Sequence, residues 1–217
     1  MQSLRRPRAL AVGLLVLFLV ISALVVFGRL VPWEEGALRA IGVWRTSART
    51  DWMLGFTFLG NALIEVPAAF LMAWVLWRLG RGAHANRYLI AVITGELFYV
   101  VLKALFRRPR PAIIERLGDA GWYSYPSGHT MLAPILWSFG LLLVASAVGN
   151  RVLKGILVLG AVLIPLLLGV SRVYLGVHYP SDVLGALLIG AAWVVWWWPR
   201  DPEPSSASAT SSAPAIR

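Results

Sequence analysis

The feature that most constrains this chain is a series of six apolar runs, each long enough to cross the hydrocarbon core of a membrane. A transmembrane helix needs about 20 consecutive, mostly apolar residues, and a backbone inside lipid must satisfy its own hydrogen bonds. The runs cover approximately Ala9–Leu30, Trp52–Leu79, Tyr88–Phe106, Thr130–Val148, Val152–Val170 and Val183–Trp198. The sequence therefore predicts an all-α, integral membrane bundle of six transmembrane helices.

The composition supports a lipid environment. Of the 217 residues, 59% are hydrophobic and 14% are charged, whereas a soluble domain carries roughly 25% charged residues. The net charge is +10, but the basic residues lie between the apolar runs and not on one soluble face. This distribution favours anionic membrane lipid over nucleic acid as a partner. The chain has no Cys, which excludes disulfides and thiolate chemistry.

The first run could be a signal peptide or a retained anchor. Its apolar stretch is longer than the roughly 7–15 residues of a signal peptide, and no small-x-small cleavage site follows it, which favours an anchor. Lys and Arg residues cluster before the first run and between runs two and three and runs four and five. By the positive-inside rule we expect these segments on the cytoplasmic side, although the intervening segments are basic too.

Three further features complete the predicted organisation. Leu38, Ile41 and Trp44 recur at helical spacing, which indicates a short interfacial helix between the first two spans, while an ordinary loop fits equally well. The second run contains Pro67, where we expect a kink or a loop. The C-terminal segment is rich in Ser, Ala and Pro, so we expect it to be disordered. The predicted divisions are a basic cytoplasmic N-terminus at 1–8, a membrane domain at 9–198 and a cytoplasmic tail at 199–217.

Counting the spans brings the polar residues together. An odd span ends on the membrane face where the next even span begins, and that face lies opposite the N-terminus. The residues at such positions are Lys103, Arg110, Ser127, Gly128, His129, Ser171, Arg172, His178 and Asp182. Ionisable groups at membrane depth are costly and usually functional. The sequence therefore predicts one polar site on the extracytoplasmic face.

The residue types in this group indicate phosphate chemistry. The cations and the free N–H groups at two helix starts describe an anion pocket. His129, His178 and Asp182 supply the nucleophile, acid and orienting carboxylate that phosphoryl transfer requires. Structural interpretations also exist, with Ser127 as an N-cap, Asp182 as a first-turn acid, and Arg172 and Lys103 reaching toward headgroups. These interpretations do not explain why all the residues share one face.

Three motifs occur in order, namely KALFRRPRP, YPSGHT and SRVYLGVHYPSD. They match the patterns Lys-x6-Arg-Pro, Pro-Ser-Gly-His and Ser-Arg-x5-His-x3-Asp, with no departure at a signature position. With these motifs the chain resembles the type 2 phosphatidic acid phosphatase (PAP2) family, and in particular its bacterial integral-membrane lipid phosphatases. The resemblance covers roughly residues 9–198.

The resemblance implies a role for each matching residue. His178 would attack phosphorus and form a phosphohistidine, Asp182 would hold the other ring nitrogen, and His129 would protonate the leaving oxygen and then activate water. The phosphate oxygens would be held by Lys103, Arg110, Ser127, the Gly128 backbone N–H and Arg172. The resemblance also implies no metal or other cofactor, because the cations neutralise the phosphate charge as Mg²⁺ does in kinases.

The implied function is hydrolysis of a lipid phosphate on the extracytoplasmic face of the cell membrane. Candidate substrates are phosphatidic acid, phosphatidylglycerol phosphate and undecaprenyl pyrophosphate. One alternative is a phosphotransferase, in which a hydroxyl group other than water takes the phosphoryl group from His178. Another is a non-catalytic lipid-phosphate binder or transporter, although binding alone would need only the cations. A haloperoxidase does not fit, because that branch of the family is soluble.

Two acids, Glu65 and Glu96, lie inside apolar runs. Glu96 precedes Lys103 by seven residues, so both project from nearly the same face of a helix. We hypothesise that Glu96 faces the bundle interior and supports the basic site. A purely structural hydrogen bond between helices fits Glu96 equally well.

Overall fold

The computed structural model describes residues 5–118 and 120–199, and within these ranges the regular structure is entirely helical. The elements are α1 (Arg5–Val26), α2 (Val31–Val43), α3 (Ser47–Phe58), α4 (Ala62–Arg78), α5 (Gly82–Phe106), α6 (Gly128–Ala133), the π-helix η1 (Pro134–Ser138), α7 (Phe139–Ala147), α8 (Arg151–Tyr174) and α9 (Pro180–Trp197). Five spans are long and apolar enough to cross a membrane, and the bent pair of α3 and α4 makes a sixth. The predicted six-span, all-α bundle is confirmed.

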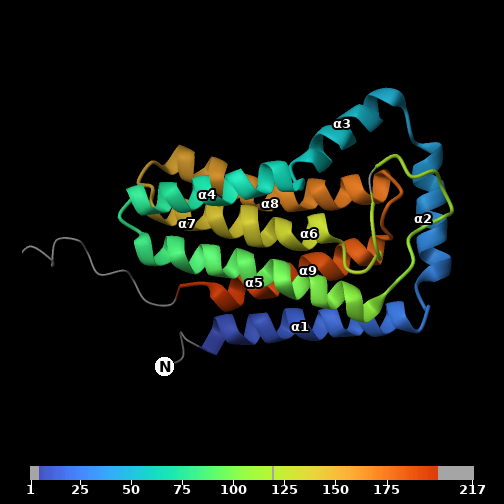
Figure 1. Ribbon diagram of the computed structural model, residues 1–217, viewed down its shortest axis with the longest axis horizontal. Helices are drawn as coiled ribbons and strands as arrows, with labels where there is room; N and C mark the ends of the chain where they lie inside the picture. Colours follow the sequence, from blue (N-terminus) through green and yellow to red (C-terminus); the bar gives the residue numbers. More distant parts are fainter. Residues whose placement is uncertain (1–4, 119, 200–217) are drawn as a thin grey trace, which may run out of the picture.

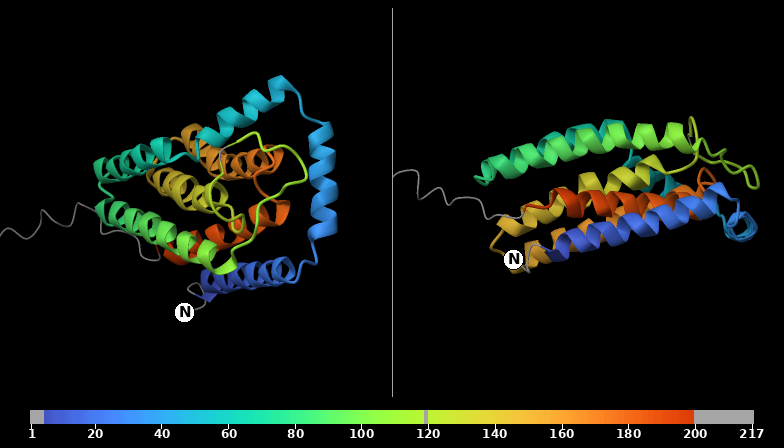
Figure 2. Two further views of the ribbon diagram at one scale, coloured as in Figure 1. Left: turned by 45° about the vertical axis from the view of Figure 1, so that its right-hand side comes forward. Right: turned by 90° about the horizontal axis from the view of Figure 1, so that it is seen from below.

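The spanning helices lie side by side, and one end of the bundle carries most of the irregular chain (Figure 1). There α2 lies across the helix ends, and the loop between α5 and α6 folds over them (Figures 1 and 2). The start of α1 and the end of α9 lie at the opposite end. The two ends of the bundle are therefore built differently, and the complex end is the one that holds the motifs.

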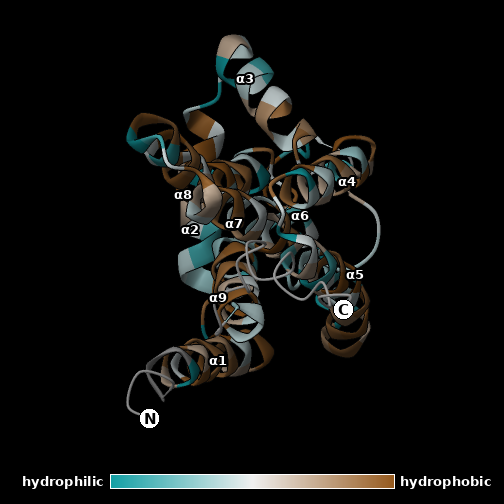
Figure 3. Cartoon of the chain, turned by 90° about the vertical axis from the view of Figure 1, so that its left-hand side faces the viewer, coloured by the Kyte–Doolittle hydropathy of each residue, from teal (hydrophilic) through white to brown (hydrophobic). Residues whose placement is uncertain are grey.

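The outward faces of the helices are apolar, as the hydropathy colouring of Figure 3 shows. Phe70, Leu105 and Val152 are 64%, 71% and 73% exposed. A soluble monomer rarely presents apolar surface in such continuity. In a chain with six spans this surface is the face that contacts lipid tails.

Two clusters of side chains hold the bundle together. The larger one joins α4, α5, η1, α7 and α9, with Tyr88 and Phe139 fully buried at its centre. The second joins α1 to α9 and to the loop before α6, where Phe18 stacks on Tyr125. The hydroxyls of Ser22 and Tyr125 also hydrogen-bond at 2.7 Å. Together these contacts fix α1 and the loop against the rest of the bundle.

The second span differs from the prediction, because it breaks at residues 59–61 and not at Pro67. Helices α3 and α4 meet there at an angle of 47°. The side chain of Asn61 accepts a hydrogen bond of 2.9 Å from the Leu63 N–H and so caps α4. Pro67 lies inside α4 without ending it. Pro67 therefore does not break the span, and a kink at Pro67 stays a prediction.

The fourth span is continuous but not uniform. Residues 134–138 form a π-helix, in which the Phe139 N–H bonds to Pro134 O five residues back and one extra residue is taken up in the turn. Pro134 explains the local change, because it has no N–H to donate to the α-helical ladder. The span therefore changes helical register just after its polar start.

Other boundaries shift in ways that matter for the site. The helix predicted between the first two spans is present as α2, so the loop alternative is wrong. Its residue Leu38 is fully buried. Helix α8 continues to Tyr174 and takes in Ser171 and Arg172. Of the predicted terminal segments, residues 1–4 and 200–217 lie outside the described residues.

Candidate active site

The predicted residues gather at the end of the bundle that carries α2 (Figure 1). The ends of α5 and α8 and the starts of α6 and α9 meet there, as the counting of spans predicts. These segments carry Lys103, Arg172, Ser127, Gly128, His129 and Asp182, while Arg110 lies in the loop after α5 and His178 in the link between α8 and α9.

The ring of His178 is held between Asp182 and Arg110. Its Nδ1 lies 3.4 Å from Asp182 Oδ2, and its Nε2 lies 3.1 Å from Arg110 Nη1. A guanidinium group can only donate, so Nε2 is the acceptor and Nδ1 carries the proton toward Asp182. Burial lowers the pKa of His178 to about 4, although Asp182 opposes this shift. At neutral pH the ring is therefore uncharged, with its lone pair directed at the cations.

Asp182 both starts α9 and orients His178. Its Oδ2 accepts a 2.8 Å hydrogen bond from the Tyr179 N–H, which is part of a capping box, and another from Ser124 Oγ. Its Oδ1 accepts a 2.6 Å hydrogen bond from Arg108 Nη1. The structural interpretation of Asp182 as a first-turn acid is therefore correct, and it coexists with the contact to His178.

Arg110 is fixed by backbone carbonyl groups. Its guanidinium donates to Gly121 O at 2.6 Å, to Trp122 O at 3.1 Å and to Val177 O at 2.7 Å. Burial lowers the pKa of Arg110, while Tyr99 and Asp182 oppose that shift. An arginine stays protonated in proteins, so these contacts hold a fixed positive charge beside His178.

Lys103 and Gly128 both contact Tyr99. Lys103 is 3% exposed, and its Nζ donates to the Tyr99 hydroxyl at 2.6 Å. A Cβ added at Gly128 would lie 2.6 Å from the same hydroxyl. Only glycine lets the start of α6 come this close. The backbone at that helix start is therefore kept near the ammonium group.

His129 begins α6 and lies beside the break in the second span. A Cβ added at Gly60 would lie 2.7 Å from Cδ2 of the His129 ring. The ring therefore rests against the backbone at the break between α3 and α4. Gly128, the chain neighbour of His129, contacts Tyr99, which accepts a hydrogen bond from Lys103. His129 therefore lies beside the cationic part of the site.

The remaining signature residues are also placed by specific contacts. Arg172 is 3% exposed and donates through Nη1 to Thr57 Oγ1 at 2.7 Å, so it does not reach out toward headgroups. Buried Lys103 does not either. Ser127 occupies the N-cap position of α6, but its hydroxyl pairs with Thr130 Oγ1 at 2.9 Å and caps no backbone group. Ser171 donates to Leu168 O within its own helix.

A cavity of about 730 Å³ adjoins His129 between α4, α5 and α6. Gly128, His129 and Tyr99 form its wall at the site, and most of the remaining lining is apolar. That apolar lining includes Val66, Ala69, Phe70, Leu89, Val92, Ile93, Leu97 and Leu132. His129 and the start of α6 therefore lie between the polar site and this apolar cavity.

The acids Glu65 and Glu96 line this cavity. The Glu96 side chain is exposed to it and does not lie in the closed core of the bundle. Within the described residues no ion pair joins Glu96 to Lys103, whose ammonium donates to Tyr99. The supporting role of Glu96 remains a prediction.

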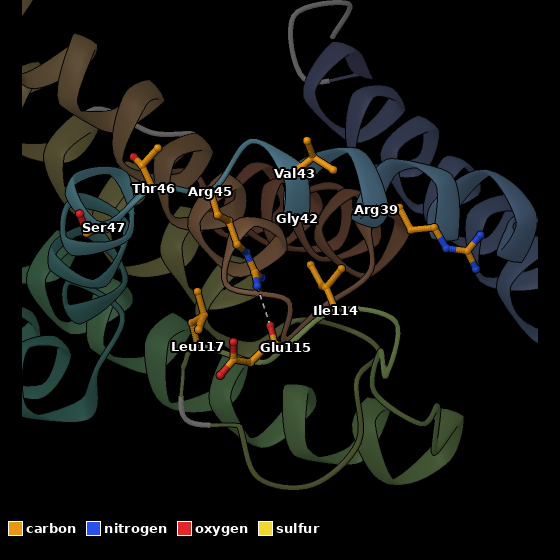
Figure 4. Close-up of a pocket in the computed structure, with 9 residues that line it drawn as sticks. All are labelled: Arg39, Gly42, Val43, Arg45, Thr46, Ser47, Ile114, Glu115 and Leu117. Atoms are coloured by element: carbon orange, nitrogen blue, oxygen red, sulfur yellow. Dashed lines mark hydrogen bonds between the residues drawn. The ribbon is translucent and has the colours of Figure 1, made fainter.

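Arg45 braces the outer edge of the site. It donates to Tyr174 O at 3.0 Å through Nε and to Glu115 O at 2.8 Å through Nη1, the second bond being drawn in Figure 4. These bonds tie the last turn of α8 to the segment after α2 and to the loop before α6. Arg45 also lines a surface hollow of about 720 Å³, whose described lining contains none of the predicted site residues (Figure 4).

Sequence reasoning missed several residues that contact the signature positions. These residues are Thr57, Tyr99, Arg108 and Ser124, and Glu34 joins them through its contact with Arg108. Arg108 and Ser124 lie close to motif residues in the sequence, which was an available signal. Glu34 gave none, because it is separated from Arg108 by 74 positions and lies in a segment predicted only as an interfacial helix.

The comparisons with known proteins identify the family of the chain. The sequence model of the PAP2 superfamily matches residues 84–203, a segment that contains every predicted site residue. Phosphatidylglycerophosphatase B of Bacillus subtilis (strain 168) is 28% identical over 180 residues, 82% of this chain and 88% of that protein. Undecaprenyl-diphosphatase BcrC of the same organism is 31% identical over 142 residues, 61% of this chain and 66% of that protein. The crystal structure of a transmembrane PAP2-type phosphatidylglycerolphosphate phosphatase from Bacillus subtilis matches with a TM-score of 0.80 and 26% identity, covering 86% of this chain and 93% of that chain.

Proposed function

Because the chain belongs to the PAP2 superfamily and is a membrane phosphatase of that type, we propose that it hydrolyses lipid phosphomonoesters or pyrophosphates through a phosphohistidine at His178. The orientation of the His178 ring carries this proposal. Nε2 presents a lone pair to the cationic pocket, and Nδ1 faces Asp182. This is the orientation that in-line attack on a bound phosphate requires.

The proposed reaction has two steps. First, His178 Nε2 attacks phosphorus, the bond to the leaving oxygen breaks, and His129 gives that oxygen a proton. The ring then carries a positive charge, which Asp182 stabilises through Nδ1–H. Second, water attacks phosphorus, His129 takes its proton, and the phosphorus–nitrogen bond breaks to release inorganic phosphate. Throughout, the charge on the phosphate oxygens is neutralised by Lys103, Arg110 and Arg172, with further hydrogen bonds from Ser127 and the Gly128 N–H.

The cavity beside His129 supports a lipid substrate. His129, to which we assign the proton for the leaving oxygen, lines this cavity, and the apolar lining beyond it suits an acyl or prenyl chain. The relatives named above act on phosphatidylglycerophosphate and undecaprenyl diphosphate, by their names. We therefore propose phosphatidic acid, phosphatidylglycerol phosphate and undecaprenyl pyrophosphate as candidate substrates.

We further propose that residues 9–198 form the phosphatase domain and that the site faces the extracytoplasmic side of the cell membrane. The support is the position of the site at the end opposite the start of α1 (Figure 1). The start of that helix carries Arg5, Arg6 and Arg8, and such residues favour the cytoplasm. A site on the outer face could accept a lipid headgroup while the tails remain in hydrocarbon.

The test is release of phosphate from a panel of lipid phosphates and pyrophosphates in detergent, with EDTA present. Wild-type protein is compared with His178→Ala. We expect release by the wild type and a loss of at least about 1,000-fold in the variant, because a nucleophile is removed. The preferred lipid identifies the substrate.

Two outcomes would contradict the proposal. Release that survives in His178→Ala would exclude the phosphohistidine. Binding of lipid phosphates by both proteins without release by either would indicate a non-catalytic binder.

A further inference from the structure

We propose that Glu34 and Arg108 are positioning residues for the phosphohistidine step. Arg108 fixes Asp182 against His178, and Glu34 supplies a second buried negative charge that stabilises the positively charged, phosphorylated ring. This inference rests on the proposed function, because it concerns the intermediate of that reaction.

Arg108 joins two carboxylates. It lies in the loop after α5 and is 9% exposed. Its Nη1 donates to Asp182 Oδ1 at 2.6 Å, and its Nη2 donates to Glu34 Oε2 at 2.5 Å. The guanidinium carbon lies 4.0 Å from the centre of the Tyr179 ring. One side chain thus links α2 to the first turn of α9 and restricts the carboxylate that orients His178.

Glu34 is fully buried, although it belongs to the short helix at the edge of the bundle. Its Oε1 accepts a 3.1 Å hydrogen bond from the Ser181 N–H and another from the Ser181 hydroxyl. A buried carboxylate is costly unless it is paired and hydrogen-bonded. Both oxygens of Glu34 meet that condition, through Arg108 and Ser181.

The charges of the neighbouring side chains determine how much Glu34 stabilises the positively charged His178 ring. Within the buried group of Glu34, Arg108 and Asp182, two side chains are negative and one is positive, so this group sums to −1 on the Nδ1 side of a neutral His178, apart from the cations that would face the phosphate. Phosphorylation at Nε2 leaves a proton on Nδ1 and makes the ring positive, so the sum becomes zero. Without Glu34 the sum would start at zero and rise to +1. Glu34 therefore stabilises the charged intermediate more than the resting enzyme.

The first test is Glu34→Gln, which keeps the size of the side chain and removes its charge. The matched control is Glu35→Gln, because Glu35 lies on the same helix and pairs with exposed Arg39 at 3.1 Å. Rapid-quench single turnover with a ³²P-labelled lipid phosphate, stopped in alkali, measures formation of the phosphoenzyme. We expect Glu34→Gln to slow that formation by about 10- to 100-fold, and Glu35→Gln to change it by less than about 2-fold.

Inhibition by inorganic phosphate separates a charge effect from a collapsed pocket. Phosphate binds the cations and does not require a charged His178. We therefore expect an unchanged inhibition constant in Glu34→Gln. A variant that loses phosphate inhibition together with turnover would show that Glu34 holds the fold and would overturn the proposal. So would a variant that forms phosphoenzyme at the wild-type rate.

A double variant, Glu34→Gln with Arg108→Gln, tests the charge count even if the single variant is poorly folded. Removing both charges leaves Asp182 alone and restores a net charge of −1. We expect the double variant to form phosphoenzyme faster than Glu34→Gln, because the charge is restored, but more slowly than the wild type, because Asp182 loses its contact with Arg108. A double variant as slow as the single one would mean that the pair is only a structural clamp. If the wild type itself forms no phosphoenzyme, the proposed function fails, whatever these variants do.

Discussion

The His178 ring is 2% exposed, and its single acidic neighbour is outnumbered by cations. An uncharged imidazole is easily accommodated there, but a proton on Nε2 would have to face Arg110 without solvent. The surroundings therefore keep the nucleophile available over a wide range of pH. The same surroundings make protonation of His178 unfavourable in the folded protein. The folded state should therefore lose stability in acid.

The lowered pKa of His178 predicts how the stability of the folded protein depends on pH. The pKa of His178 is about 4 in the folded protein, against an ordinary 6.5, because burial disfavours the charged ring. The unfolded chain then binds the proton more readily, so folding stability falls as pH drops from 6.5 toward 4, by roughly 3 kcal/mol in total. Unfolding in detergent, followed by tryptophan fluorescence, should show a melting temperature that falls less steeply in His178→Gln. Parallel curves for the two proteins would contradict this assignment.

The signature residues could be predicted because their spacing is local. Lys103 and Arg110, or His178 and Asp182, lie within one short motif, so the sequence itself shows that they act together. Glu34 and Arg108 meet only because α2 folds across the bundle. No local pattern encodes such a contact, and hydropathy treats a buried Glu and an exposed one alike. The sequence therefore predicted which signature residues meet at one end of the bundle, but not the network that holds Asp182.

At the scale of elements, the break between α3 and α4 shows where hydropathy fails. The apolar average runs on through residues 59–61, since a Gly and an Asn in a long run barely lower it. The break depends on one cap at Asn61 and on close packing at Gly60 against His129. Span number was therefore predictable, whereas the element that supports the proposed acid was not.

Gly60→Ala tests this support. The added methyl group would lie 2.7 Å from the His129 ring and push it from its place. A displacement of about 1 Å can cost about 100-fold in rate, so we expect kcat to fall by one to two orders of magnitude. Gly55→Ala is the control, because a Cβ there meets nothing within 4 Å. Equal kcat values for the two variants would show that Gly60 does not position His129.

The cavity between α4 and α5 yields a second prediction at this scale. Val66→Trp should fill part of it and hinder a lipid chain, while the phosphate pocket stays open. We expect a KM for lipid phosphate raised about 10-fold, which is the loss of about 1.4 kcal/mol of binding. Hydrolysis of a short soluble phosphomonoester should be unchanged. Leu71→Trp, on an exposed part of the same helix that does not line the cavity, is the control. Equal loss on both substrates would place the lipid elsewhere.

For the whole molecule, the difference between the two ends of the bundle predicts which side of the membrane the candidate site faces. Ala112 lies in the exposed loop at the site end, and Asn86 is exposed at the other end, near the start of α5. The chain has no Cys, so Ala112→Cys and Asn86→Cys each introduce one thiol. On intact cells, a membrane-impermeant maleimide should label the first and reach the second only after permeabilisation. The reverse pattern would place the site in the cytoplasm.

The π-helical turn at residues 134–138 has a consequence for how the molecule can vary. Successive residues of an α-helix point about 100° apart, so one extra residue offsets the two halves of the span by about that angle. His129, before the turn, and the packed Phe139, after it, therefore follow different rotational positions around the axis of the same span. Core residues after the turn therefore point in directions that the start of the span, with His129, does not set.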